Sequence, residues 1–139
     1  MFVKQEIALI HLIVKDYDEA ISFFTEKLGF KLIENGMDGD KRWVVIAPPG
    51  PEGSGIHLAR ASTKQQEKHI GNQTGGRVFL SLQTDNFWRN YKKMKVAKVK
   101  FIEEPRKETY GIVVKFLDLY GNKWDLIQLK DNRGTLKSF

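Results

Sequence analysis

The chain of 139 residues has no cysteine and only three histidines, His11, His57 and His69. The absence of cysteine excludes a disulfide framework, a cysteine-bound zinc or iron–sulfur centre and a thiol nucleophile. A metal site can take imidazole ligands only from those three histidines. Long apolar runs are also absent: residues 7–14 are too few to cross a bilayer, and no small-residue cleavage site follows them. We therefore expect no membrane span, no signal peptide and a cytoplasmic location.

Hydrophobic residues make up 41% of the chain and charged residues 29%, which is typical of a globular domain. The formal net charge is +6, and lysines gather where one expected helix ends, at Lys92, Lys93, Lys95, Lys98 and Lys100. Because no nucleic-acid-binding motif accompanies them, we expect no nucleic-acid partner. The charge instead favours a neutral or anionic small ligand. Candidate anion contacts are Arg42, Arg60, Arg77 and Arg106.

The two halves of the chain repeat each other. Asp16 matches Asp85, 69 positions later, and each closes an apolar run before a helical pattern. The further matches are residues 31–34 with 100–103, 44–45 with 113–114 and, after one deletion, 55–58 with 123–126. Because the matches occur in the same order, they indicate two copies of one structural unit.

Each half has the pattern of a strand, a helix and three further strands. In the first half the expected strands are 8–14, 30–34, 42–47 and 55–60. The helix between the first two begins at a cap, Asp16 or Asp18, and ends at Gly29. Its apolar stripe is Ala20, Phe23, Phe24 and Leu28.

The second half predicts strands at 78–84, 99–103, 112–117 and 124–129, with a turn at 118–122. We expect Asp85 to cap its helix. The apolar side of that helix is Phe87, Trp88, Tyr91 and Met94. Polar residues 61–76 link the halves, and residues 131–139 have no periodicity and form a tail.

Several local motifs make the chain resemble the vicinal oxygen chelate superfamily of glyoxalases, bleomycin-resistance proteins and extradiol dioxygenases. They are Val14-Lys15-Asp16, Leu28-Gly29-Phe30, Thr84-Asp85, Tyr110-Gly111 and above all residues 118–126. The resemblance implies an α+β fold, in which two tandem βαβββ modules (7–60 and 77–130) form a curved mixed sheet with a cleft. It further implies a single glyoxalase-like domain over residues 1–130 and, as in many small members, a homodimer.

Metal-dependent members of that superfamily hold a divalent ion with four side chains. The matching positions here are Leu9, His57, Phe79 and Asp125. Leucine and phenylalanine cannot ligate, so only His57 and Asp125 remain competent. His11 would complete a two-histidine, one-carboxylate set, but it lies about 6.6 Å farther along its strand than the usual ligand. We therefore expect no standard metal site and no cofactor, with a divalent metal held by His57 and Asp125 as the alternative.

The repeat places His57 and Asp125 at equivalent positions, where they can face each other as an acid–base or ion pair. A buried carboxylate needs a partner, and for Asp125 this is an arginine, a metal or His57. For His11 the plainer expectation is a half-buried, hydrogen-bonded residue. Side chains expected to line the cleft are Leu9, His11, Trp43, Phe79, Ser81, Gln83 and Tyr110.

These residues support two main hypotheses. In the first, the protein binds a small neutral or anionic metabolite or antibiotic in its cleft, without the standard metal site. In the alternative, it is a glyoxalase-like lyase or isomerase acting on a small oxygenated metabolite, with His57 and Asp125 as metal ligands or as an acid–base pair. A third possibility is a structural or interaction module, which nothing in the sequence excludes.

Overall fold

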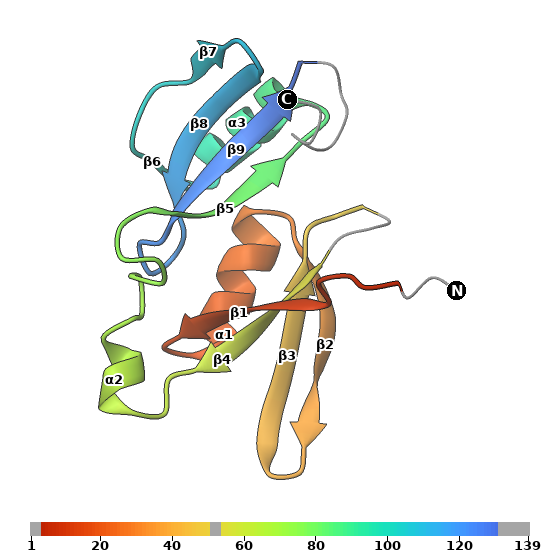
Figure 1. Cartoon of the computed structure of the whole chain (residues 1–139), viewed down its shortest axis with the longest axis vertical. Helices are drawn as coiled ribbons and strands as arrows, with labels where there is room; N and C mark the ends of the chain where they lie inside the picture. The colour runs from red at the N-terminus through yellow and green to blue at the C-terminus, as the bar shows by residue number, and fades with distance from the viewer. Residues whose placement is uncertain (1–3, 51–53, 131–139) are drawn as a thin grey trace. The chain divides into compact units, whose positions relative to one another are not determined.

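The computed structural model describes residues 4–50 and 54–130, and the chain forms two compact units, Met1–Ile70 and Gly71–Phe139 (Figure 1). One predicted module, 7–60, falls in the first unit, and the other, 77–130, falls in the second. Each unit contains its own sheet of parallel and antiparallel strands together with helix, which confirms the α+β prediction. The predicted tail, 131–139, lies outside the described residues.

The first unit contains four strands and a helix that widens into a π-helical turn. The elements are β1 (Leu9–Val14), α1 (Tyr17–Ser22), η1 (Phe23–Lys27), β2 (Lys31–Asp38), β3 (Lys41–Ala47), β4 (Gly55–Arg60) and the short α2 (Lys64–Glu67). The sheet order is β1-β4-β3-β2. β1 runs parallel to β4, and the other pairs are antiparallel. This is the predicted βαβββ order.

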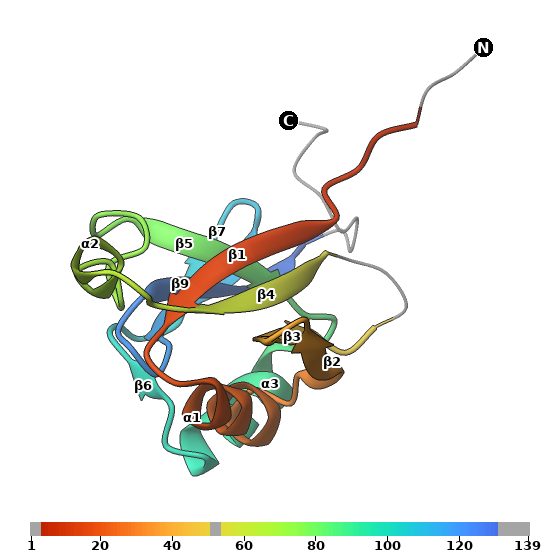
Figure 2. The same cartoon turned by 90° about the horizontal axis from the view of Figure 1, so that it is seen from below.

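Among the described residues of this unit, helix covers one face of the sheet and leaves the other face free of helix. Figure 2 shows α1 on a single side of the strands. The predicted stripe of α1 and η1 supplies buried side chains to that side. The strand residues in this core are Leu12, Val14, Val44, Ile46, Ile56 and Leu58. Since strand side chains alternate, every second residue points to the opposite, helix-free face.

The second unit repeats this arrangement. Its elements are β5 (Val78–Gln83), α3 (Phe87–Val96), β6 (Lys100–Phe101), β7 (Arg106–Glu108), β8 (Gly111–Leu117) and β9 (Lys123–Leu129). The order is β5-β9-β8-β6, with β7 also on β8, and β5 runs parallel to β9 as β1 does to β4. The predicted strand 99–103 is therefore too long, because pairing with β8 is shared between β6 and β7.

The predicted turn at 118–122 is built around the buried carboxylate of Asp118. Its Oδ1 accepts the backbone N–H groups of Tyr120, Gly121 and Asn122, at 3.0–3.1 Å. Its Oδ2 accepts the Asn122 amide at 3.0 Å and the Trp124 indole N–H at 3.1 Å. One side chain thus closes the β8–β9 connection and orients a tryptophan in the core.

Local signals at helix ends were read correctly in the first unit. The Asp16 side chain accepts from Glu19 N–H at 2.9 Å, and Gly29 adopts a φ of +74° just after the π-helical turn. The polar linker also contains α2, capped by Thr63, which is too short to show a period. No helix within residues 4–50 and 54–130 has both the length and the apolar character of a membrane span.

Two expectations for α3 are wrong. The cap is Asn86, whose side chain accepts from Arg89 N–H at 3.2 Å, and not its neighbour Asp85. Trp88 remains 48% exposed, since the helix starts one residue later and the buried stripe passes through Phe87 and Tyr91.

The corrected cap is testable by a neighbouring pair of substitutions. Asn86→Ala removes the acceptor for the first turn and should lower the free energy of unfolding by about 1 kcal/mol. Asp85→Ala is the matched control and should change it by less than half as much. Urea denaturation followed by circular dichroism measures both, and a larger loss in Asp85→Ala would contradict the assignment.

Candidate functional site

The helix-free face of the first sheet brings two histidines into contact. The parallel register aligns His11 with His57, two positions beyond the Leu9–Gly55 pair. The Nδ1 atoms of the two histidines lie 2.9 Å apart, and their rings meet edge to face, with centroids 5.0 Å apart. A hydrogen bond between two Nδ1 atoms requires a proton on one and a lone pair on the other, so the tautomers are coupled. The predicted hydrogen bond of His11 is thereby observed, but its side chain is exposed and not half-buried as expected.

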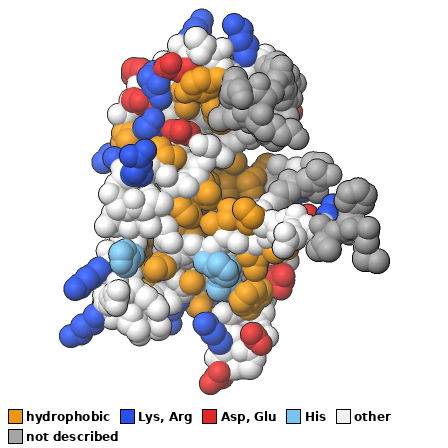
Figure 3. All heavy atoms as spheres, viewed as in Figure 1, with side chains coloured by type: hydrophobic (Ala, Val, Ile, Leu, Met, Phe, Trp, Pro, Cys, Tyr) orange, Lys and Arg blue, Asp and Glu red, His pale blue; other side chains and the backbone are white. Residues whose placement is uncertain are grey.

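An aromatic side chain covers the inner histidine. Trp43 of β3 stacks on His57, with ring centroids 4.1 Å apart and an interplanar angle of 25°. Val45 is the cross-strand partner of His57 on the same face. As a result His57 is only 6% exposed, although it lies on the face without a helix. Figure 3 shows histidine among hydrophobic side chains on the viewed surface.

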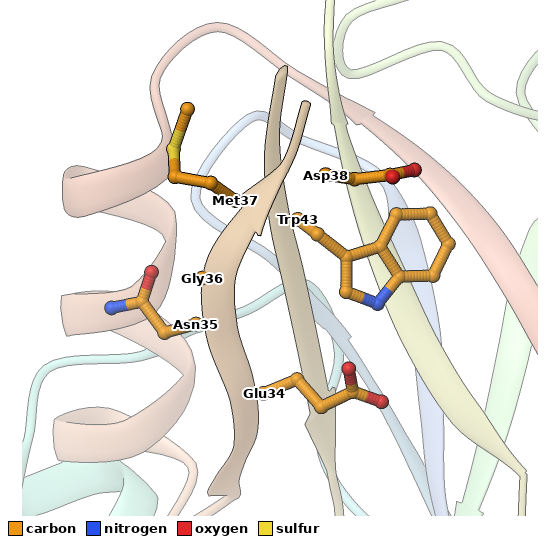
Figure 4. Close-up of a pocket in the computed structure, with 6 residues that line it drawn as sticks. All are labelled: Glu34, Asn35, Gly36, Met37, Asp38 and Trp43. Atoms are coloured by element: carbon orange, nitrogen blue, oxygen red, sulfur yellow. The ribbon is translucent and has the colours of Figure 1, made fainter. Parts of the chain in front are cut away.

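A cavity of about 520 Å³ adjoins this stacked pair. Its lining is Glu34, Asn35, Gly36, Met37, Asp38 and Trp43. Figure 4 shows the Glu34, Asp38 and Trp43 side chains on one side of the strands, while the other labelled side chains project from the opposite side. Gly36 is the register partner of Trp43. Because glycine has no side chain, nothing on β2 fills the space between the two carboxylates at that point.

A second cavity, of about 410 Å³, shares Glu34 with the first. Its lining is Ala8, Leu9, Ile33, Glu34, Val45, Ala47, Pro48, Gly50, Ser54 and Gly55. Leu9 and Val45 make part of this wall apolar. The Glu34 and Asp38 carboxylates were missed from sequence. The strand 42–47 pairs with the strand before it in a hairpin. Alternation of side chains along both strands would have placed Glu34 and Asp38 on the same face as Trp43.

The electrostatics of the first unit keep His57 neutral. Burial is the main cause that lowers the pKa of His57 from its ordinary value of 6.5, and the positive charges of His11 and Lys41 lower it further. Arg42, a candidate anion contact, belongs to the opposite face. Its guanidinium pairs with Asp18 at 2.9 Å and donates to Asn35 at 3.1 Å.

The equivalent face of the second unit carries different chemistry. Asp125 of β9 is aligned with Ser81 of β5, as His57 is with His11. Lys115 of β8 reaches Asp125 Oδ1 at 3.5 Å, an ion pair without a hydrogen bond. The partner that Asp125 finds in its own unit is therefore a lysine, which was not among the expected partners. Cross-strand alternation could have suggested it, because Lys115 and Asp125 are directly paired.

The other predicted site residues of the second unit are either exposed or packed against apolar side chains. Ser81 and Gln83 are exposed on β5, and Tyr110 packs against the cluster of Val113, Ile127 and Leu129. Phe79 lies at a register irregularity and meets the ring of Trp124 edge to face, at 5.9 Å. His57 and Asp125 belong to different units, so their mutual pairing stays a prediction.

The histidine pair does not fit a metal ion bound between its two Nδ1 atoms. Nitrogens that share a tetrahedral zinc, each at about 2.0–2.1 Å, lie about 3.3 Å or more apart. The observed 2.9 Å separation is a hydrogen-bond distance. The described residues also bring together no group of three or more histidine, aspartate or glutamate side chains suited to a metal.

The depressed pKa of His57 predicts a pH dependence of stability. The unfolded chain takes up a proton on this imidazole near pH 6.5, whereas the folded chain resists protonation until lower pH. Unfolding therefore binds a proton, and stability present above pH 6.5 is lost as the pH falls. Urea midpoints between pH 7.5 and 5 should fall less in His57→Gln than in the unsubstituted chain. The exposed His69→Gln is the control, and an unchanged slope in His57→Gln would contradict the prediction.

Comparison with known proteins shows the family of this chain. The Glyoxalase/Bleomycin resistance protein/Dioxygenase superfamily profile matches residues 6–126. An uncharacterized protein of Shewanella frigidimarina (strain NCIMB 400) is 54% identical over 132 residues, covering 94% of this chain and 98% of the relative. Among solved structures, UcmS2 has a TM-score of 0.78 at 25% identity, covering 90% of this chain and 98% of UcmS2. TnmS3, an antibiotic binding protein from Streptomyces sp. CB03234, has a TM-score of 0.75 at 22% identity, covering 94% of this chain and all of TnmS3. The chain belongs to the Glyoxalase/Bleomycin resistance protein/Dioxygenase superfamily.

Proposed function

We propose that this protein binds a small planar organic molecule, a metabolite or an antibiotic, on the helix-free face of its first sheet. The observation that carries the proposal is the stacked Trp43–His57 pair beside an open cavity. A half-buried indole beside a cavity is a surface on which a flat apolar ligand can stack. That TnmS3, a protein of similar fold, is an antibiotic binding protein supports this class of ligand.

The size of the site suits such a ligand. Cavities of about 300–1,000 Å³ with apolar walls and few polar groups are typical of small-molecule sites. The cavity beside Trp43 has about 520 Å³. Leu9 and Val45 continue the apolar wall in the neighbouring cavity. Three of the six residues that line the cavity beside Trp43 are polar, and two of these, Glu34 and Asp38, lie on the same side of the strands as Trp43.

Local charge disfavours an anionic ligand. The net charge of +6 favoured a neutral or anionic one, but Glu34 and Asp38 line the cavity. Neither carboxylate has an ion-pair partner among the described residues, while Arg42 is engaged on the other face. An anion would meet uncompensated negative charge here, so a ligand without negative charge fits better.

The proposal is tested by ligand binding in tryptophan variants. A thermal-shift screen of metabolites and antibiotics identifies binders, and Trp43→Ala should weaken binding of each by at least about tenfold because the stacking surface is lost. Trp88→Ala is the matched control, since Trp88 is exposed in the second unit. Equal loss in both variants, or no stabilisation by any compound, would overturn the proposal. A neutral, an anionic and a cationic naphthalene derivative then report the preferred ligand charge.

The same protein sample tests the lyase or isomerase alternative. Turnover of methylglyoxal with glutathione above a protein-free blank, lost in His57→Ala, would favour that alternative over simple binding. If no such turnover is found, the ligand screen decides whether the protein binds a small molecule.

We also propose that the chain forms a homodimer, as the family resemblance implies. The edge strand β2 offers one surface for association, because all of its residues are exposed and they include Leu32, Ile33 and Met37. Light scattering coupled to size-exclusion chromatography should give twice the mass of the chain, and a monomer would contradict the proposal.

A further inference from the structure

We propose that His11 fixes the tautomer of His57, so that the Nε2–H of His57 donates a hydrogen bond to an acceptor oxygen of the ligand. This inference rests on the proposed binding function, because it names the polar contact that the ligand makes. It assigns the ligand a neutral acceptor such as a carbonyl oxygen. It also gives the two histidines different roles, with His11 as a positioning residue and His57 as a binding residue.

The first observation is an unpaired polar atom. His57 Nδ1 is engaged by His11, but the buried His57 Nε2 has no hydrogen-bond partner among the described residues. Buried polar groups in proteins are nearly always paired, so an unpaired one needs an explanation. The distal edge of the ring, which carries Nε2, points away from the β4 backbone on the helix-free face. A ligand bound on this face would supply the missing partner.

The second observation is the different environment of the two rings. His11 is exposed, whereas His57 is 6% exposed beneath Trp43. Because water can solvate the exposed ring, we assign His11 as the donor of the pair. His11 then donates through Nδ1–H, and His57 Nδ1 must accept. A neutral imidazole whose Nδ1 accepts carries its only proton on Nε2, so His57 presents a donor.

Other charged groups lie near His57. Lys41 on β3 and His11 on β1 both lower the pKa of His57, because positive charge on either of them disfavours a proton on His57. Glu34 and Asp38 of β2 lie on the same face, beyond Trp43, and are nearest to the indole. Hence the surroundings of His57 keep its ring neutral, and the Nε2–H group remains a neutral donor suited to a neutral acceptor.

The tautomer is measured without any ligand. In protein labelled with ¹⁵N at histidine, two-bond nitrogen–proton correlation spectra distinguish a protonated from an unprotonated ring nitrogen. At pH 7.5, His57 should show an unprotonated Nδ1 and a protonated Nε2. His69, exposed in the linker, provides the spectral reference for an exposed histidine. A His57 that is unprotonated at Nε2 would overturn the proposal.

The recognition step is tested with two matched probes, 2-acetylnaphthalene and 2-ethylnaphthalene. They share the ring, and only the first has a carbonyl acceptor. The unsubstituted protein should bind the ketone about tenfold more tightly, the effect of one hydrogen bond. His57→Phe should bind both probes equally, and His57→Gln, which keeps a donor, should restore part of the preference. A preference that persists in His57→Phe would overturn the assignment.

The two experiments separate this inference from the proposed function. If neither naphthalene binds and the ligand screen is empty, the binding function fails, and the recognition step fails with it. If both probes bind through Trp43 without a preference for the ketone, the binding function stands and only the role of His57 is wrong.

Discussion

The candidate site depends on the parallel register between β1 and β4. That register aligns His11 with His57 and directs both side chains to the face opposite α1. A slip of one residue would turn the histidines into the core and the buried leucines outward, because strand side chains alternate. Burial of Leu12 and Leu58 against the helix therefore fixes the register, and the histidine pair follows from it.

The same scaffold carries different chemistry in its two copies. In the first unit the aligned pair on β1 and β4 is His11 and His57, and in the second the pair on β5 and β9 is Ser81 and Asp125. Each copy keeps an apolar core between one helix and one face of its sheet, while the opposite face is free to vary. Function in such a fold is therefore a property of the helix-free faces and not of the repeat.

Charge illustrates why a total over the chain is a poor guide to a site. The chain carries +6, yet the cavity beside Trp43 is lined by Glu34 and Asp38. Two of the arginines are occupied elsewhere, Arg42 by Asp18 and Arg106 by Glu103 and Glu108. Ion pairs formed at short range remove cations from the surface that a ligand meets, so local geometry outweighs the net charge.

The sequence by itself determined the features that depend on short-range physics. The repeat, the α+β class, the Asp16 cap, Gly29 at its positive φ and the turn built around Asp118 all rest on interactions among near neighbours. Even there, the choice between Asp85 and Asn86 as a cap failed, because both residues can accept the same N–H and the start of the helix selects one.

Only the tertiary structure decided the contacts between distant residues. His11 and His57 are 46 positions apart, and their contact depends on strand pairing, helix burial and the intervening hairpin together. The Lys115–Asp125 ion pair and the register irregularity at Phe79 likewise arise from how strands are aligned. Residue types fix which side chains can donate, accept or stack. Which of these side chains meet depends on the register of strands that are far apart in sequence, and packing of the whole core sets that register.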